Sequence, residues 1–151
     1  MNRQDKNNHG ERGDTETRSR INKAESADPD LDTLIERVIG AAIEVHRELG
    51  PGFQEITYHR ALMIELDLCG ITYESERLVS LDYKGRVIGE GRIDLLIENR
   101  LVIELKAADS NPRTYSRQVA SYLKATGLKI GLVINFHAAV LKDGIARVIN
   151  R

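Results

Sequence analysis

Two helical patterns open the patterned part of the chain. Between about Asp32 and Leu49 apolar residues recur at helical spacing and share one face. Gly50 and Pro51 end this helix. A second helix is predicted from about Gln54 to Cys69, before Gly70, and we expect the Cys69 thiol to be buried.

Strand patterns alternate with one further helix in the rest of the chain. Asn111 is a candidate cap for that helix, Pro112 suits its first position and Gly127 follows its end. The strand segments are 71–90 with a turn at Tyr-Lys-Gly-Arg, a hairpin over 91–107, a buried strand over 129–136 and a last hairpin around Asp143-Gly144. We therefore predict an α/β chain with a mixed sheet and helices packed against it.

The hairpin over residues 91–107 places two carboxylates opposite each other. Its odd positions from Ile93 to Leu105 are all aliphatic, so that face is predicted to be core. If Glu98-Asn99-Arg100 forms the turn, Asp94 lies directly opposite Glu104. A slip of one residue would break the match of the aliphatic face, which favours this register.

Two interpretations of these charges remain open. Like charges directly opposite destabilise a sheet, and a cation between them would remove that penalty; an oxygen-only cluster suits Mg²⁺ or Mn²⁺. Alternatively the charges are the solvated face of an ordinary hairpin. Leu96 and Val102 occupy the same face as Asp94, Glu104 and Lys106, and their apolar character indicates a covered face.

Two helical positions bear on this choice. Glu55 lies at the first turn of an apolar stripe, and Gln118 lies on the stripe that contains Tyr122. We expect both polar side chains to point inward. Each also has an ordinary explanation, because Glu55 would interact favourably with the helix dipole and Gln118 would suit the edge of a core.

Composition and charge set the bounds. The chain has 151 residues, which suits one domain, and a formal net charge of −1, so nucleic-acid binding would need a local positive patch. One cysteine excludes an internal disulfide. Neither a membrane span nor a signal peptide is predicted, so we expect a cytoplasmic protein with no membrane partner. Residues 1–30 are polar and predicted to be a disordered tail, before a domain over 31–151.

A resemblance to a known family follows from four motifs in order. "GFQEITY" reads as G-x-x-E-x-x-Y, "GRID" as G-x-x-D, "ELK" as E-x-K and "QVASY" as Q-x-x-x-Y. Together they resemble the PD-(D/E)XK nuclease superfamily, and with "YLKATGLKIGLVINF" and "LKDGIARVI" they resemble its GxxExxY family. The resemblance covers about residues 31–150 and implies a restriction-endonuclease-like core, a central mixed sheet flanked by helices.

The resemblance also implies a set of roles. Asp94 and Glu104 would bind Mg²⁺ or Mn²⁺ with the Leu105 carbonyl, and Glu55 would be an additional ligand. Lys106 would position or help deprotonate the attacking water, and Gln118 would orient the site with support from Tyr122. Arg92, on the Asp94 face, would contact phosphate or pair with a carboxylate. His137 departs from the glycine usual in the family, and His46 has no implied role beyond a hydrogen bond at the helix end.

The function implied is metal-dependent hydrolysis of DNA phosphodiester bonds, in repair, recombination or defence. The alternative is a binding module for nucleic acid or another partner that keeps the fold without turnover. Because small nucleases often gain binding surface by pairing, we expect a homodimer.

Overall fold

The computed structural model describes residues 28–151. The predicted tail, residues 1–30, lies almost wholly outside this range, so the domain boundary stays a prediction. Contacts group residues 35–151 into one compact unit, for which the fold is described here. Helix α2 (Pro29–Leu49) belongs to this unit from Ile35 onward.

The unit is built on a five-stranded mixed sheet. The elements after α2 are α3 (Glu55–Leu68), β1 (Tyr73–Tyr83), β2 (Arg86–Ile97), β3 (Leu101–Lys106), the 3₁₀ helix η1 (Pro112–Tyr115), α4 (Ser116–Thr126), β4 (Ile130–Asn135), the 3₁₀ helix η2 (Leu141–Gly144) and β5 (Ile145–Ile149). Strand order follows the sequence from β1 to β5, and only the β3–β4 pair is parallel. A mixed sheet flanked by helices confirms the predicted fold class.

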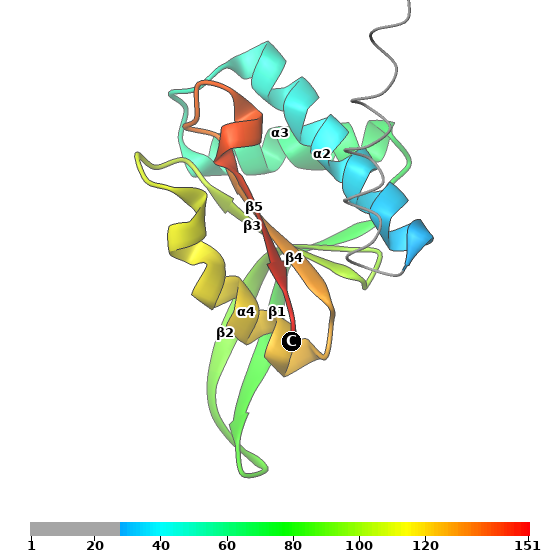
Figure 1. Cartoon of the computed structure of the whole chain (residues 1–151), viewed down its shortest axis with the longest axis vertical. Coiled ribbons are helices and arrows are strands. Elements are labelled where there is room, and N and C mark those ends of the chain that lie inside the picture. Colours follow the sequence, from blue (N-terminus) through cyan, green and yellow to red (C-terminus); the bar gives the residue numbers. More distant parts are fainter. Residues whose placement is uncertain (1–27) are drawn as a thin grey trace, which may run out of the picture. The chain divides into compact units, whose positions relative to one another are not determined.

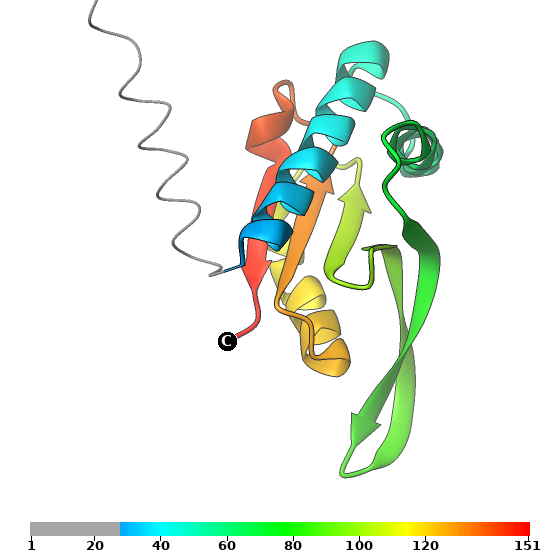
Figure 2. The same cartoon turned by 90° about the vertical axis from the view of Figure 1, so that its right-hand side faces the viewer.

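Helices cover both faces of this sheet. Figures 1 and 2 show α4 on one face and α2 on the other. Tyr122, Val119 and Leu123 of α4 pack with Val102 and Val133 of the central strands. Because β3 is buried on both faces, it reads as an almost continuous apolar run, and Glu104 is conspicuous within it.

Strand β2 is longer than predicted. The predicted segments were divided between residues 90 and 91, but one strand runs from Arg86 to Ile97, and the β1–β2 hairpin reaches past the rest of the sheet (Figures 1 and 2). Gly91 lies within the continuous strand, and its lack of a side chain makes room for helix α4. A Cβ there would lie 2.6 Å from Cε1 of Tyr122.

The last predicted hairpin is wrong. Residues 141–144 form η2, and only β5 follows it, antiparallel to β4. Gly144 is buried, and a Cβ on it would clash with the carbonyl oxygen of Asn135. Gly144 therefore packs against the end of β4, while Asp143 is exposed, and the pair is not at the tip of a hairpin.

Helix ends follow the sequence signals, but the predicted burial of Cys69 is wrong. The Asn111 side chain accepts a hydrogen bond from the Arg113 amide at 2.9 Å, and Gly127 ends α4 with φ +72°. Cys69 was expected to be buried but is exposed, because it lies beyond Leu66, the last buried residue of α3. No helix within residues 28–151 is long and apolar enough to cross a bilayer.

Candidate functional site

The β2–β3 register is the one predicted. Ile97 pairs with Leu101 and Leu95 with Ile103, so continuing the register brings Asp94 opposite Glu104. Regular pairing stops just before these two residues. Because the Leu105 amide is not used in backbone pairing with β2, it donates a hydrogen bond to Oδ2 of Asp94 at 2.8 Å.

Glu104 is a buried carboxylate whose two oxygens have different surroundings. Its residue is 4% exposed, and Oε1 lies 3.4 Å from Nζ of Lys106. Oε2 is buried and has no hydrogen-bond partner among the described residues. Burial, followed by the charges of Asp94 and Glu55, raises the pKa of Glu104 to about 7, against the opposing effect of Lys106.

Lys106 is the cation of this cluster. Burial lowers the pKa of its ammonium, but Glu104, Glu55 and Asp94 more than offset this effect, so the net pKa is raised. Nζ also lies 4.8 Å from the centroid of the Tyr115 ring. The Lys106 carbonyl accepts a bond from Phe136 of the β4 side. Since carbonyls alternate along a strand, the Leu105 carbonyl points the other way, toward Asp94.

Glu55 approaches the cluster from α3 but is exposed, not inward-facing as we expected. Burial raises its pKa, Lys106 lowers it and Asp94 raises it, which places Glu55 within electrostatic reach of both groups. The loop before α3 fixes this position. Tyr58 donates a hydrogen bond to the Gly50 carbonyl, accepts one from the Phe53 amide at 3.2 Å and stacks on Phe136 at 4.5 Å.

Three other candidates, Gln118, Tyr122 and Arg92, form hydrogen bonds or ion pairs with groups other than Asp94 and Glu104. Gln118 is exposed and donates to the Tyr122 hydroxyl at 3.2 Å, so the expectation that it points inward is wrong. The apolar stripe of α4 passes through Val119, Tyr122 and Leu123, beside Gln118. Arg92 is exposed and lies 3.8 Å from Glu76.

Asn135 is a site-supporting residue that sequence reasoning missed. It is 2% exposed, and its amide donates to the carbonyls of Ala108 and Ser110, each at 2.8 Å. Its oxygen accepts from the amides of Ala108 and His137, each at 3.2 Å. It thus ties the chain after β3 to the chain after β4. A lone amide in an otherwise apolar buried strand was the available signal.

His46 and His137 both lie near the end of β4. His46 Nε2 is 2.8 Å from the Ala138 carbonyl oxygen, so α2 is held to the loop after β4. His137 is exposed, and its Nε2 lies 3.9 Å from Oδ1 of Asp109.

The donor set suits a hard cation but is not closed. Within residues 28–151 no group of three or more His, Cys, Asp or Glu is placed to hold a metal ion. Two carboxylates and a backbone carbonyl are oxygen ligands of the kind that Mg²⁺ prefers, with water completing the shell. The unpartnered Oε2 of Glu104 is the feature that a cation would satisfy.

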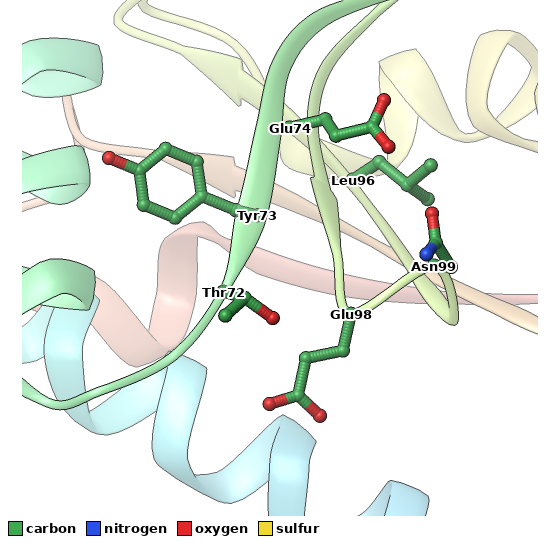
Figure 3. Close-up of a pocket in the computed structure, with 6 residues that line it drawn as sticks. All are labelled: Thr72, Tyr73, Glu74, Leu96, Glu98 and Asn99. Carbon is green, nitrogen blue, oxygen red and sulfur yellow. The ribbon is translucent and has the colours of Figure 1, made fainter.

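Two surface pockets among the described residues are lined by other residues than Asp94, Glu104 and Lys106. One pocket, shown in Figure 3, lies beside the β2–β3 turn and is lined by Thr72, Tyr73, Glu74, Leu96, Glu98 and Asn99. Tyr73 and Glu74 point to opposite sides of β1 (Figure 3). Of its two carboxylates, Glu74 is paired with Arg77 at 2.6 Å, and Glu98 is exposed in the β2–β3 turn.

Comparison with known proteins identifies the family. A model of the PD-(D/E)XK nuclease superfamily matches residues 32–148. The chain belongs to the PD-(D/E)XK nuclease superfamily. No curated protein and no solved structure shows significant similarity to it. Members of this superfamily typically use a divalent metal ion, and the name of the superfamily implies a nucleic-acid substrate.

Proposed function

We propose that the chain is a metal-dependent nuclease that hydrolyses DNA phosphodiester bonds in the cytoplasm, in repair, recombination or defence. The observation that carries this proposal is Glu104, a buried carboxylate with an unpartnered oxygen, held next to Asp94 and Lys106 in a superfamily of nucleases. The G-x-x-E-x-x-Y segment, residues 52–58, supports membership of the GxxExxY family.

Asp94, Glu104 and the Leu105 carbonyl would hold Mg²⁺ or Mn²⁺, with Glu55 as an outer ligand. A divalent ion bound there supplies a Lewis acid that activates water and neutralises negative charge on the phosphate. Asp94 would be oriented for this role by the Leu105 amide, which fixes one carboxylate oxygen.

Lys106 would stabilise the charge that develops on the phosphate. Its ammonium is held between Glu104 and the Tyr115 ring, so its position is fixed before substrate arrives. The neighbouring carboxylates favour its protonated form, which suits electrostatic stabilisation and positioning of water better than proton abstraction.

A second function is favoured by the position of Gln118. This side chain bonds Tyr122 and not a carboxylate, so the site lacks the orienting contact that the motif implies. A module that binds nucleic acid without turnover would tolerate this arrangement.

Calorimetric titration with Mg²⁺ and Mn²⁺, followed by a cleavage assay on single-stranded, duplex and branched DNA, tests the proposal. Asp94→Asn is the test variant, and Glu90→Gln, an exposed carboxylate of the same strand, is the matched control. We expect metal uptake and cleavage in the wild type and control, and neither in Asp94→Asn. Uptake with DNA binding but no cleavage would favour the second function, and no uptake even with DNA present would contradict a metal site.

The expected homodimer is part of the proposal. Sedimentation equilibrium with and without DNA checks it, and a single monomeric species in both conditions would remove it.

A further inference from the structure

Charge is divided unevenly along this chain. Between Asp109 and Asp143 there is no carboxylate side chain, while five cationic residues occur: Arg113, Arg117, Lys124, Lys129 and Lys142. The whole chain carries −1, so its near-neutral total conceals a strongly basic segment. Local concentration of one sign of charge is what an electrostatic footprint for a polyanion requires.

Three of these cations share the solvent side of η1 and α4. Arg113, Arg117 and Lys124 are exposed, as is Gln118, whereas Val119, Tyr122 and Leu123 face the core. None of the three cations has an ion-pair partner within the described part of the chain. We call Arg113, Arg117, Gln118 and Lys124 the α4 basic face.

The α4 basic face begins beside the candidate site. Tyr115, which lies in the sequence between Arg113 and Arg117, carries Nζ of Lys106 over its ring. Tyr122, bonded to Gln118, packs against Gly91, three residues before Asp94. The basic face and the carboxylate pair are therefore joined through two buried or half-buried tyrosines.

We propose that the α4 basic face binds the phosphodiester backbone of a nucleic-acid strand and leads that strand to the carboxylate pair. Arg117 and Lys124 are separated by about 10 Å along the helix, from its rise per residue. One strand of a duplex presents about three phosphates over that length. Gln118 then acts as an exposed hydrogen-bonding group on this face. This role explains its exposure to solvent, which an orienting role in the metal site does not explain.

The chemistry of the face favours nucleic acid over a membrane surface. An interfacial helix buries large apolar side chains in lipid, but those of α4 are already committed to the core of the fold. The exposed non-charged residues of α4 are small or polar. A phosphate-binding face next to a phosphodiester-cleaving site also needs no second partner to explain it, and to that extent the inference rests on the proposed function.

Binding measured without cleavage tests this inference. The variant Arg113→Gln/Arg117→Gln/Lys124→Gln removes three cations from the face. The matched control Arg47→Gln/Lys84→Gln/Arg86→Gln removes three exposed cations elsewhere. Fluorescence anisotropy with labelled single-stranded and duplex DNA is recorded in EDTA over a series of salt concentrations.

We expect the face variant to bind DNA at least about tenfold more weakly at low salt. The slope of log K against log salt should become shallower by about 2 to 3, since each lost phosphate contact removes about 0.7 to 0.9. The control should keep the wild-type slope. An unchanged slope in the face variant, no DNA binding by the wild type, or binding to anionic phosphatidylserine vesicles in place of DNA would each overturn the inference.

The two proposals fail separately in this design. If the wild type binds DNA through the face but cleaves nothing with Mg²⁺ or Mn²⁺, the nuclease proposal fails and the face stands. If the wild type cleaves and the face variant binds and cleaves equally well, the face fails and the nuclease proposal stands.

Discussion

At the residue scale, Glu104 sets the chemistry of the site. A carboxylate buried in the middle strand of a sheet costs free energy unless it is paired. Lys106 pairs with one oxygen only, at 3.4 Å, and Asp94 adds a second negative charge nearby. The fold keeps an arrangement that is unfavourable on its own, and strongly perturbed ionisable groups of this kind cluster at functional sites.

This arrangement makes the stability of the metal-free protein depend on pH. The pKa of Glu104 is about 7 in the fold against 4.5 for the free group, so folding favours the protonated form. The stabilisation is complete below pH 4.5 and is lost as pH rises through 7, by up to about 3 kcal/mol. Urea unfolding in EDTA should show this loss, and Glu104→Gln should remove it. If the free energy of unfolding of Glu104→Gln fell with rising pH as it does in the wild type, Glu104 would not be the source of the pH dependence.

A second residue-scale prediction concerns Gly91. Gly91→Ala places a Cβ 2.6 Å from the Tyr122 ring, which should cost about 1 to 3 kcal/mol in the free energy of unfolding. Gly89→Ala is the control, because its Cβ would meet only Leu81 at 3.7 Å. In a background of Tyr122→Leu, with the ring gone, the cost of Gly91→Ala should shrink. Equal costs in both backgrounds would show that the ring is not responsible.

At the element scale, the structure explains how much the sequence could predict. The Asp94–Glu104 register followed from the aliphatic alternation and the short turn, both local signals. The prediction of the last hairpin was wrong because Gly144 is buried against Asn135, a packing contact between η2 and β4 that the Asp-Gly turn signal does not reveal. The prediction that Gln118 points inward was wrong because Gln118 lies one residue from the buried stripe of α4. Helix spacing alone did not decide whether this position faces the core or solvent.

The loops that follow β3 and β4 depend on Asn135. Asn135→Ala removes four hydrogen bonds from a buried position and should cost about 2 to 4 kcal/mol. Urea unfolding measures the cost, and hydrogen exchange at the Ala108 and His137 amides reports the loosened loops. Asn135→Asp, which cannot donate to the Ala108 and Ser110 carbonyls, should not restore stability. A cost under about 0.5 kcal/mol for Asn135→Ala would refute this role.

At the scale of the whole molecule, a near-neutral chain carries its candidate acidic site and its basic segment in different places. The carboxylates gather where β2, β3 and α3 meet, and the carboxylate-free segment from 110 to 142 supplies α4 and its surroundings. The net charge alone therefore conceals this division of charge. The superfamily assignment and the unpartnered oxygen of Glu104 both support the proposed cation site.

Cation binding should therefore stabilise the whole fold, and more so at higher pH. Binding to the native state alone adds RT ln(1 + [L]/Kd), about 2.7 kcal/mol at a hundredfold excess over Kd. Below a pH of about 7 the metal must displace a proton from Glu104, so the gain in melting temperature on adding Mn²⁺ should grow between pH 5.5 and 8. Melting curves with and without Mn²⁺ measure this gain. Asp94→Asn should show little gain at either pH, whereas Glu90→Gln should behave as wild type. A gain in Asp94→Asn as large as in the wild type would place the ion elsewhere on the protein.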